Sequence, residues 1–376
     1  MRDVWCLLTD REELRPPASG PVSDVGAMAW ALTLAERGWG RVHPNPLVGA
    51  VIVRDGQMIA EGWHDAFGDP HAEAVALTAA GERARGATLY VTLEPCNHQG
   101  KQPPCVDAIL AAGISRVVVA LTDPNPVATG GAAMLRAAGV AVEVGLLGEQ
   151  AARLNARFVH RFTPSSRPFT AVKLAVSLDG RIADADGRSQ WISGPEARAF
   201  VHHLRAGFGA IGIGGNSLMA DNARLTVRGD VIPATPPIRV VFDPSGVVPL
   251  HQAIFRDAEQ LPVWMVMRGA TPARTIAGYE SVGARVLLAD TLEDAVGALA
   301  TQGMDSLLVE GGGRLAGAFL AAGLLDRVYQ VQSPVWLGEG RSAWSGLGRP
   351  PLADALRWHV VERRALGDDT LLTLER

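Results

Sequence analysis

The stretches PHAEAVAL (residues 70–77) and LEPCNHQGKQPPC (residues 93–105) decide the fold of the first half of this chain. The first stretch carries a His-x-Glu pattern, His71 and Glu73, at the start of a predicted helix, and the second carries two of the chain's three cysteines. One cysteine follows an apolar strand. The other opens the next helix, where the helix N-terminus stabilises a thiolate. This order predicts an α/β domain built beside a metal site.

One imidazole and two thiolates form a ligand set suited to tetrahedral zinc, with the fourth position open to water. Zinc lowers the pKa of such a water to about 7, and a nearby carboxylate can carry its proton to a leaving amine. We therefore predict one catalytic zinc per chain, held by His71, Cys96 and Cys105, with Glu73 as the proton carrier. A structural zinc with His98 as a fourth ligand is the alternative. Zinc deaminases place two residues between the cysteines, whereas this chain places eight.

The bulk composition indicates an ordinary globular protein. The length of 376 residues predicts two or three domains. The net charge of −4 gives no basic excess that would attract nucleic acid. No apolar run approaches the roughly 18 residues of a membrane-spanning helix. Residues 1–22 lack the organisation of a signal peptide and are interpreted as a weakly structured extension of a cytoplasmic protein. In that reducing compartment Cys96 and Cys105 are expected to be ligands, not a disulfide, and Cys6 has no assigned role.

Predicted strands alternate with helices along the whole chain, which is typical of α/β folds. A polar link, TPSSRP (residues 163–168), is expected to separate a first domain over residues 23–163 from a second over residues 168–376. The first domain is expected to be a sandwich with largely parallel strands. It includes a hairpin around Asp55-Gly56 and one last helix over residues 149–162. In the second domain, strands are expected from residue 169 to residue 334.

Several motifs of the first domain resemble the deaminase half of the bifunctional riboflavin-biosynthesis deaminase/reductases. They are HPNPLVGAVIV (43–53), AEGWH (60–64), GDPHAE (68–73), YVTLEPCNHQGKQPPC (90–105), RVVVALTDPNP (116–126) and LNARF (154–158). Other deaminases of cytidine, guanine or tRNA adenosine share His-x-Glu and Pro-Cys but not the eight-residue spacer. The resemblance implies a cytidine-deaminase-like α/β/α sandwich. Asn97 departs from the serine that is usual in the family.

The resemblance also implies roles for four residues outside the zinc site. Asn45 would hydrogen-bond the pyrimidine, while His64, His98 and Lys101 would line the pocket and its phosphate side. Each residue also has a plainer interpretation from the sequence alone. Asn45 can be a turn residue between two prolines, His64 a partly buried histidine at a hairpin end, and Lys101 a solvated loop charge.

Two glycine-rich turns stand out in the second domain, GAIGIGGNS (209–217) and LLVEGGGRLAGAF (307–319). Backbone N–H groups at such turns suit a phosphate or pyrophosphate. Neither turn is a complete GxGxxG fingerprint with an acidic residue about 20 positions on. A tight strand–helix turn is therefore the alternative to a nucleotide site.

The second domain resembles the reductase half of the same family, which has a dihydrofolate-reductase-like α/β fold and uses NADPH. The motifs are VKLAVSLDGRIA (172–183), GRSQWISG (187–194), HHLRA (202–206), SLMADNARLTVR (217–228) and VEGGG (309–313). By resemblance, the substrate is surrounded by Lys173, Ser189, Arg205, Asp221, Leu225, Arg228 and Glu310. The cofactor would be bound by Ala175, Trp191, Ser217, Asp221, Gly311, Gly312 and Gly313.

Some of these residues have a physical rationale of their own. Arginines match phosphate bidentately, although Arg205 and Arg228 can also be surface charges. Trp191 can stack on a cofactor or belong to the core. Lys173 lies in an apolar strand, where an ammonium needs a partner, for which Asp221 or Glu310 are candidates. The chain departs from the family at Asn216-Ser217, which replaces Gly-Thr, and at Asn222-Ala223, which replaces Asp-Pro.

The resemblance implies an enzyme with two reactions. The first is zinc-dependent hydrolytic deamination of 2,5-diamino-6-(5-phosphoribosylamino)pyrimidin-4(3H)-one. The second is reduction of the ribosyl C1′ by NADPH, with Lys173 and Asp221 as catalytic residues. One rival is a deaminase whose second domain binds nucleotide without reducing it. The other rival is a nucleic-acid-binding module, which would need a basic stripe with interleaved aromatics. The expected partner is the small-molecule substrate, without nucleic acid or membrane, and a homo-oligomer is compatible with the sequence.

Overall fold

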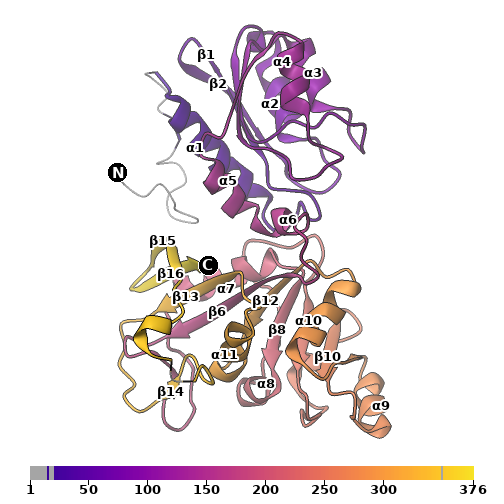
Figure 1. The fold of residues 1–376 in the computed structure, drawn as a ribbon, viewed down its shortest axis with the longest axis vertical. Coiled ribbons are helices and arrows are strands. Elements are labelled where there is room, and N and C mark those ends of the chain that lie inside the picture. Colours follow the sequence, from indigo (N-terminus) through magenta and orange to yellow (C-terminus); the bar gives the residue numbers. More distant parts are fainter. Residues whose placement is uncertain (1–14, 17–20, 349) are drawn as a thin grey trace. The chain divides into compact units, whose positions relative to one another are not determined.

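The computed structural model describes residues 15–16, 21–348 and 350–376 (Figure 1). The extension expected over residues 1–22, with Cys6, therefore lies largely outside the described residues. The chain divides into two compact units, Met1–Pro164 and Ser165–Arg376. None of the described helices has the length and apolar character that crossing a bilayer requires. The two units are described separately below.

The first unit is built on a five-stranded sheet with the order β2-β1-β3-β4-β5. Strand β1 runs antiparallel to both β2 and β3, whereas β3, β4 and β5 are mutually parallel. The expectation of a largely parallel sheet was therefore wrong, because the predicted hairpin places β1 between two antiparallel neighbours. Asp55 and Gly56 both have positive φ, as a two-residue hairpin turn requires. The strands are β1 Gly49–Arg54, β2 Gln57–Trp63, β3 Thr88–Leu93, β4 Arg116–Leu121 and β5 Ala141–Val144.

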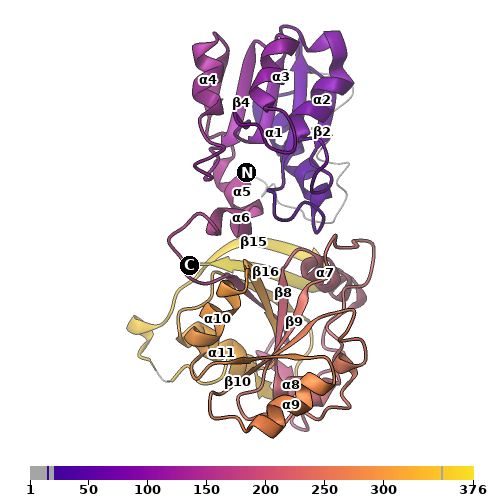
Figure 2. The same ribbon diagram turned by 90° about the vertical axis from the view of Figure 1, so that its right-hand side faces the viewer.

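Helices cover both faces of this sheet, so the first unit is the predicted α/β/α sandwich (Figures 1 and 2). Helices α2, α3 and α4 pack apolar residues such as Leu77, Ile109 and Leu135 against one face. Helix α1 packs on the other face with Trp30 fully buried, and α5 packs beside it. The helices are α1 Asp24–Ala35, α2 Ala72–Ala80, α3 Cys105–Ala112, α4 Gly131–Ala137, α5 Gly148–Leu154 and α6 Ala156–His160.

The single helix predicted over residues 149–162 is instead two helices, α5 and α6, which meet at Asn155. The side chain of Asn155 is buried, accepts a hydrogen bond from Leu47 N at 2.8 Å and donates one to Leu47 O at 2.9 Å. This amide therefore pairs with backbone far away in the sequence, in the segment just before β1. The pairing explains why helical periodicity alone did not reveal the break.

The second unit has a nine-stranded sheet with the order β11-β10-β9-β8-β12-β6-β13-β16-β15. The strands from β11 to β13 are parallel, and β16 and β15 add an antiparallel edge. This C-terminal hairpin was not anticipated from the sequence. The strands are β6 Phe169–Val176, β8 Ala210–Gly214, β9 Ile238–Phe242, β10 Val263–Met267, β11 Arg285–Leu288, β12 Ser306–Glu310, β13 Arg327–Gln332, β15 His359–Leu366 and β16 Asp369–Glu375. Strands β7 Arg181–Ala183 and β14 Arg341–Ser342 form a separate pair.

Both faces of the parallel part of this sheet are buried, as parallel sheets require. Helices α10 and α11 contribute residues such as Leu299 and Phe319 to one core cluster. Helices α8 and α9 contribute Leu218 and Tyr279 to the other. The carboxyl ends of β6, β8, β9, β10 and β12 share one edge, where ligands bind in open α/β sheets. The helices are α7 Pro195–Ala206, α8 Gly215–Asp221, α9 Ala273–Ser281, α10 Leu292–Thr301 and α11 Gly313–Ala321.

Candidate active sites

The three predicted zinc ligands converge in the first unit. His71 is the N-cap of α2, Cys96 follows β3, and Cys105 is the first residue of α3. His71 Nδ1 lies 3.2 Å from Cys105 Sγ and 3.5 Å from Cys96 Sγ. The donor atoms of the three residues all lie within 4.8 Å of one another, and no other such group occurs among the residues that the structure describes. His98 is not part of this group, which leaves the fourth position of a tetrahedral site open.

The protonation of the two thiols also fits a metal. The Cys105 thiol donates to Cys96, and together with the nearby His71 this lowers the pKa of Cys96 to about 4. The same contact and burial raise the pKa of Cys105. A lowered pKa of Cys96 favours the thiolate form, which is the form that ligates zinc.

Glu73 lies in the first turn of α2, two residues beyond His71. Its side chain is 3% exposed, and burial raises its pKa. Glu73 lines the cavity beside the three ligands but is not one of them. A carboxyl group in this position can exchange a proton with a molecule in the cavity.

The cavity, called the first cavity below, has a volume of about 230 Å³. Asn45 and His64 form one part of its wall, with Asn45 Nδ2 3.1 Å from His64 Nε2. His64 Nδ1 lies 3.1 Å from the carbonyl oxygen of Pro70, so Nδ1 donates there and Nε2 accepts from Asn45. Burial lowers the pKa of His64, which favours this neutral form. Asn45 is thus held by His64 and is more than a turn residue.

His98 and Lys101 line the same cavity from the loop between Cys96 and Cys105. Lys101 is exposed, but its Nζ lies 3.8 Å from the ring centroid of Phe67, which holds the ammonium in place. The buried His98 Nδ1 has no hydrogen-bond partner among the described residues. Both side chains can therefore bind an anionic group.

Asp123 and Asn125 line the first cavity but were not proposed from the sequence. Glu94 organises their loop by accepting hydrogen bonds from the backbone N–H groups of Asp123, Gly130 and Ala132 at 2.9–3.2 Å. Burial raises the pKa of Asp123 to about 6. The sequence feature that could have indicated Asp123 is its position. Glu94 and Asp123 follow the neighbouring parallel strands β3 and β4, whose carboxyl ends lie at the same edge of the sheet.

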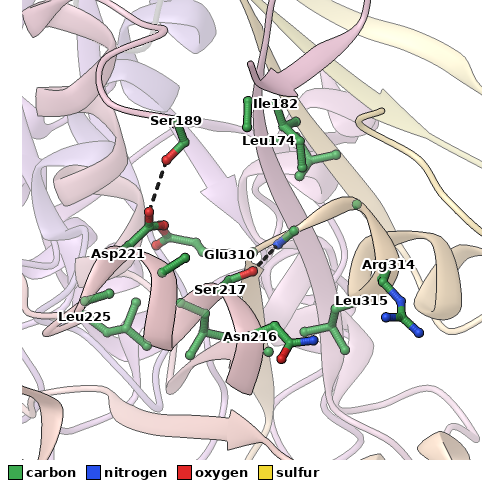
Figure 3. Close-up of a pocket in the computed structure, with 18 of the residues that line it drawn as sticks. Leu174, Ile182, Ser189, Asn216, Ser217, Asp221, Leu225, Glu310, Arg314 and Leu315 are labelled. Atoms are coloured by element: carbon green, nitrogen blue, oxygen red, sulfur yellow. Dashed lines mark hydrogen bonds between the residues drawn. The ribbon is translucent and has the colours of Figure 1, made fainter. Parts of the chain in front are cut away.

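The second unit contains a larger cavity of about 1,400 Å³, called the second cavity below (Figure 3). It lies at the carboxyl ends of the parallel strands. All the substrate and cofactor residues named for this domain line it: Lys173, Ala175, Ser189, Trp191, Arg205, Ser217, Asp221, Leu225, Arg228, Glu310, Gly311, Gly312 and Gly313.

Arg205 is a buried anchor in this wall. Its guanidinium makes a bidentate ion pair with Glu310 at 2.6 and 2.8 Å and donates to Thr226 O at 2.8 Å. The side chains of Arg205 and Glu310 are only 13% and 12% exposed. Arg205 is therefore not a surface charge, which was the alternative interpretation from the sequence. Arg205 therefore fixes the loop that carries Arg228, whose own side chain is exposed at the cavity.

His202 contributes to the same wall and was missed, although the motif HHLRA was noted. Its Nδ1 accepts a hydrogen bond from Arg228 N at 3.2 Å. Burial, with Arg205 and Arg228 nearby, lowers the pKa of His202 to about 4. The imidazole is therefore neutral at physiological pH, as this hydrogen bond requires.

Lys173 and Asp221 lie in different surroundings. Among the described residues, Lys173 makes no ion pair within 4 Å with either Asp221 or Glu310. Lys173 on β6 lies opposite Glu310 on the neighbouring strand β12 in the strand register. Burial lowers the pKa of Lys173, and the charge of Glu310 opposes this shift. Asp221 ends α8, is exposed, and accepts a hydrogen bond from Ser189 Oγ at 3.1 Å (Figure 3).

The two glycine-rich turns meet in the second cavity. Gly312 N donates to Ser217 Oγ at 2.9 Å, which ties α8 to the turn before α11 (Figure 3). A Cβ on Gly312 would lie 2.9 Å from Ser217 Oγ, and one on Gly311 would lie 3.5 Å from Gly214 N. The turns thus form a cradle that side chains would fill, at the N-terminus of α11, which fits the pyrophosphate of a dinucleotide.

Two further observations concern Trp191 and the departures from the family pattern. Trp191 is 71% exposed, so it does not belong to the core, and Arg198 lies 4.8 Å from its ring centroid.

The departures from the family pattern have simple local explanations. Ser217 stands where the family has threonine, and its side chain supplies a hydroxyl group as threonine would. Asn222 adopts a left-handed conformation after α8, and its side chain accepts from Ala253 N at 2.8 Å. Asparagine tolerates this conformation better than most residues.

Comparison with known proteins agrees with this geometry. The family profile described as the RibD C-terminal domain matches residues 168–372, and the cytidine and deoxycytidylate deaminase zinc-binding region matches residues 22–121. The riboflavin biosynthesis protein RibD of Aquifex aeolicus is 39% identical over 94% of this chain and 98% of its own length. RibD of Escherichia coli is 40% identical over 92% and 98%, respectively.

Two solved structures are similar over nearly the whole chain. RibD of Acinetobacter baumannii, form 1, is 38% identical with a TM-score of 0.79 and covers 94% of this chain and 98% of that one. A protein of Thermotoga maritima named as a diaminohydroxyphosphoribosylaminopyrimidine deaminase/5-amino-6-(5-phosphoribosylamino)uracil reductase is 36% identical with a TM-score of 0.78. It covers 93% and 98%, respectively. This chain, with its deaminase and reductase domains, therefore belongs to the RibD family of bifunctional riboflavin-biosynthesis enzymes.

Proposed function

We propose that residues 23–163 deaminate 2,5-diamino-6-(5-phosphoribosylamino)pyrimidin-4(3H)-one and that residues 168–376 reduce the product. The observation that carries the first step is the three-donor group of His71, Cys96 and Cys105 beside the buried Glu73. The name of the Thermotoga maritima protein supports the substrate. In the second step, C1′ of the ribosyl group receives a hydride and the sugar opens to a ribityl chain.

In the first cavity, Asn45 hydrogen-bonds the pyrimidine while His64 fixes the orientation of the Asn45 amide. His71, Cys96 and Cys105 would hold a zinc ion, which would supply the Lewis acidity that makes a water molecule nucleophilic toward the ring carbon that carries the amine. Glu73 takes a proton from water and delivers it to the amine, which leaves as ammonia. His98 and Lys101 bind the phosphate side of the substrate.

The zinc assignment predicts that Cys96→Ala loses most of its metal. The protein as purified should contain about one zinc per chain. The variant should contain less than about a tenth of that, because two remaining donors bind zinc poorly at micromolar protein concentrations. Metal analysis by mass spectrometry measures the difference. Cys6→Ala is the matched control and should keep its zinc. Full zinc content in Cys96→Ala would remove Cys96 from the ligand set.

In the second cavity, Arg228 binds the substrate phosphate, and the Arg205–Glu310 pair holds the loop that carries Arg228. NADPH, when bound, supplies a hydride. The ring oxygen that leaves C1′ needs a proton, and the ammonium of Lys173 supplies it. Asp221, held by Ser189, orients the sugar hydroxyls. Ala175, Trp191, Ser217 and the Gly311–Gly313 turn bind the cofactor.

For Asp221 we predict a reductase defect without loss of stability. Asp221→Asn keeps an oxygen that can accept from Ser189, and the residue is exposed, so the melting temperature should not change. Losing the charged acceptor should slow reduction by at least roughly tenfold. Assays of NADPH oxidation with the deaminated intermediate measure this. Asp230→Asn, also exposed but outside the cavity, is the control. An unchanged rate would exclude Asp221 from the site.

One experiment tests both activities together. The protein is incubated with the diaminopyrimidinone phosphate, with and without NADPH, and the products are analysed by mass. We expect the deaminated ribosyl compound without NADPH and its reduced ribityl form with NADPH. A domain that only binds nucleotide would give the deaminated compound in both cases.

The proposed setting is the cytoplasm, where Cys96 and Cys105 stay as free thiols available to metal. The proposed partners are the phosphorylated substrate and further copies of this chain, without nucleic acid or membrane.

A further inference from the structure

We infer that His202 is a positioning residue of the reductase: with Arg205 it clamps residues 226–228 to helix α7 and so places Arg228 for the substrate phosphate. The inference rests on the proposed reductase function and gives a role to a residue that the resemblance left without one. His202 lies in the wall of the second cavity together with both arginines.

The clamp consists of two contacts from one face of α7. His202 and Arg205 are three residues apart in this helix, so their side chains leave the same face. Arg205 donates to Thr226 O at 2.8 Å. His202 Nδ1 accepts from Arg228 N at 3.2 Å. The first contact alone would let the segment turn about Thr226. The second contact, two residues farther along, also fixes the direction of the backbone where it reaches Arg228.

The clamp is anchored in the sheet of the second unit. Arg205 makes its bidentate ion pair with Glu310 on β12, and Glu310 lies opposite Lys173 on β6. The guanidinium that reaches Thr226 is therefore held by the strand next to the proposed proton donor. This chain of contacts sets the separation between Arg228 and Lys173, and hence between the bound phosphate and the reacting C1′.

His202 holds the segment at the point where it becomes exposed. Leu225 is buried, whereas Arg228, Gly229 and Asp230 are exposed. The contact with His202 therefore lies at the boundary between the buried and the exposed part of the chain. It ties down the backbone of Arg228 before a ligand arrives, which reduces the conformational entropy that is lost when the guanidinium binds a phosphate.

The imidazole suits this contact because it is neutral. A neutral imidazole has one acceptor nitrogen, whereas an imidazolium has none. Burial lowers the pKa of His202, and the charges of Arg205 and Arg228 act in the same direction. The charge of Glu310 opposes this shift without reversing it. The positive charge of the phosphate side thus preserves the acceptor that holds Arg228 in place.

This role predicts a defect that depends on the substrate phosphate. His202→Leu should lower kcat/KM for the deaminated phosphate intermediate by roughly 5- to 30-fold, because Arg228 N loses its acceptor. The KM for NADPH should not change. The same variant should reduce the dephosphorylated intermediate as well as the unaltered protein does, because Arg228 then has no phosphate to bind. A merely structural defect would impair both substrates alike.

A conservative variant separates the acceptor from the shape of the side chain. Asparagine and leucine have the same branched shape, and the asparagine oxygen is as many bonds from Cα as Nδ1 of histidine is. His202→Asn can therefore accept from Arg228 N and should keep most of the activity that His202→Leu loses. His203→Asn, at the neighbouring position of α7 and outside the cavity lining, is the matched control and should reduce at the original rate.

A double variant measures the coupling to Arg228. Arg228→Ala removes the phosphate contact itself, so adding His202→Leu to it should cost little more. Four results would overturn the inference. They are an unchanged kcat/KM in His202→Leu, an equal loss with and without the phosphate, fully additive losses in the double variant, and a loss in His202→Asn as large as in His202→Leu.

Calorimetry with ribose 5-phosphate on the full-length protein separates this test from the proposed reduction. The altered positions lie in the second unit, so a weaker affinity in His202→Leu and its recovery in His202→Asn report on the second cavity without turnover. If the unaltered protein does not reduce the deaminated intermediate, the proposed function fails. The ribose 5-phosphate affinities still decide the role of His202 in that case, and equal affinities in all variants would exclude it.

Discussion

Replacing Glu73 with glutamine is expected to slow deamination by roughly 10²–10⁴-fold while the protein keeps its zinc. Glutamine has the size of glutamate but cannot take a proton from water and pass it to the leaving amine. The metal should stay because Glu73 lies beside the group formed by His71, Cys96 and Cys105 without belonging to it. Burial of the Glu73 side chain means that no bulk solvent group can easily substitute for it.

Two measurements check this expectation, ammonia release from the diaminopyrimidinone phosphate and zinc content. The variant should still reduce the deaminated intermediate, since the second cavity is lined by residues of the second unit alone. Glu82→Gln, an exposed neighbour on the same segment, is the control and should deaminate normally. Loss of zinc in Glu73→Gln would make Glu73 part of the metal site instead. Loss of both activities in a folded protein would refute two independent sites.

Lys173→Met is expected to slow reduction by roughly 10²–10⁴-fold, which is the range for losing a positioned proton donor. The chain has only two lysines, Lys101 and Lys173, against an abundance of arginines, and each of the two lines a cavity. A lysine can release a proton where an arginine cannot. Burial lowers the pKa of Lys173, so transfer from its ammonium is easier than from an exposed lysine. For the same reason, reduction should decline as pH rises through this lowered pKa.

The fold should tolerate this change, because methionine keeps the apolar stem and Glu310 remains paired with Arg205. Unfolding should therefore occur at or above the original temperature, since Lys173 has no close ion pair to lose. NADPH oxidation with the deaminated intermediate measures the effect. Lys101→Met is the reciprocal control, expected to impair deamination alone. If Lys173→Met reduces at the original rate, Lys173 is not the proton donor. Early melting would instead indicate a structural role.

The departures from the family pattern near Asp221 are compatible with reduction. Ser217 keeps the hydrogen bond to the Gly312 backbone, and Asn222 supplies the left-handed turn that ends α8. The Asn222 side chain also binds the backbone of Ala253, which anchors the loop. The two substitutions therefore leave Asp221 directed at Ser189 in the second cavity.

Local signals in the sequence were enough for the fold class, the family and the candidate zinc ligands. The Asp55-Gly56 turn, the strand before Cys96 and the helix that Cys105 opens depend on backbone preferences within a few residues. Such preferences act over short distances and can be read along the chain. The predicted α/β class of both units and the assignment to a bifunctional deaminase/reductase are confirmed.

The tertiary structure alone decided which distant groups meet. The Asn155 amide breaks a helix because it pairs with the backbone of Leu47, and His202 is neutral because it is buried beside Arg205 and Arg228. Arg268 reaches the cavity of Lys173 only because five strands lie side by side. None of these contacts has a local signal, since each depends on the packing of elements far apart in sequence. The strand order, more than any motif, therefore determines where the charges of the second cavity lie.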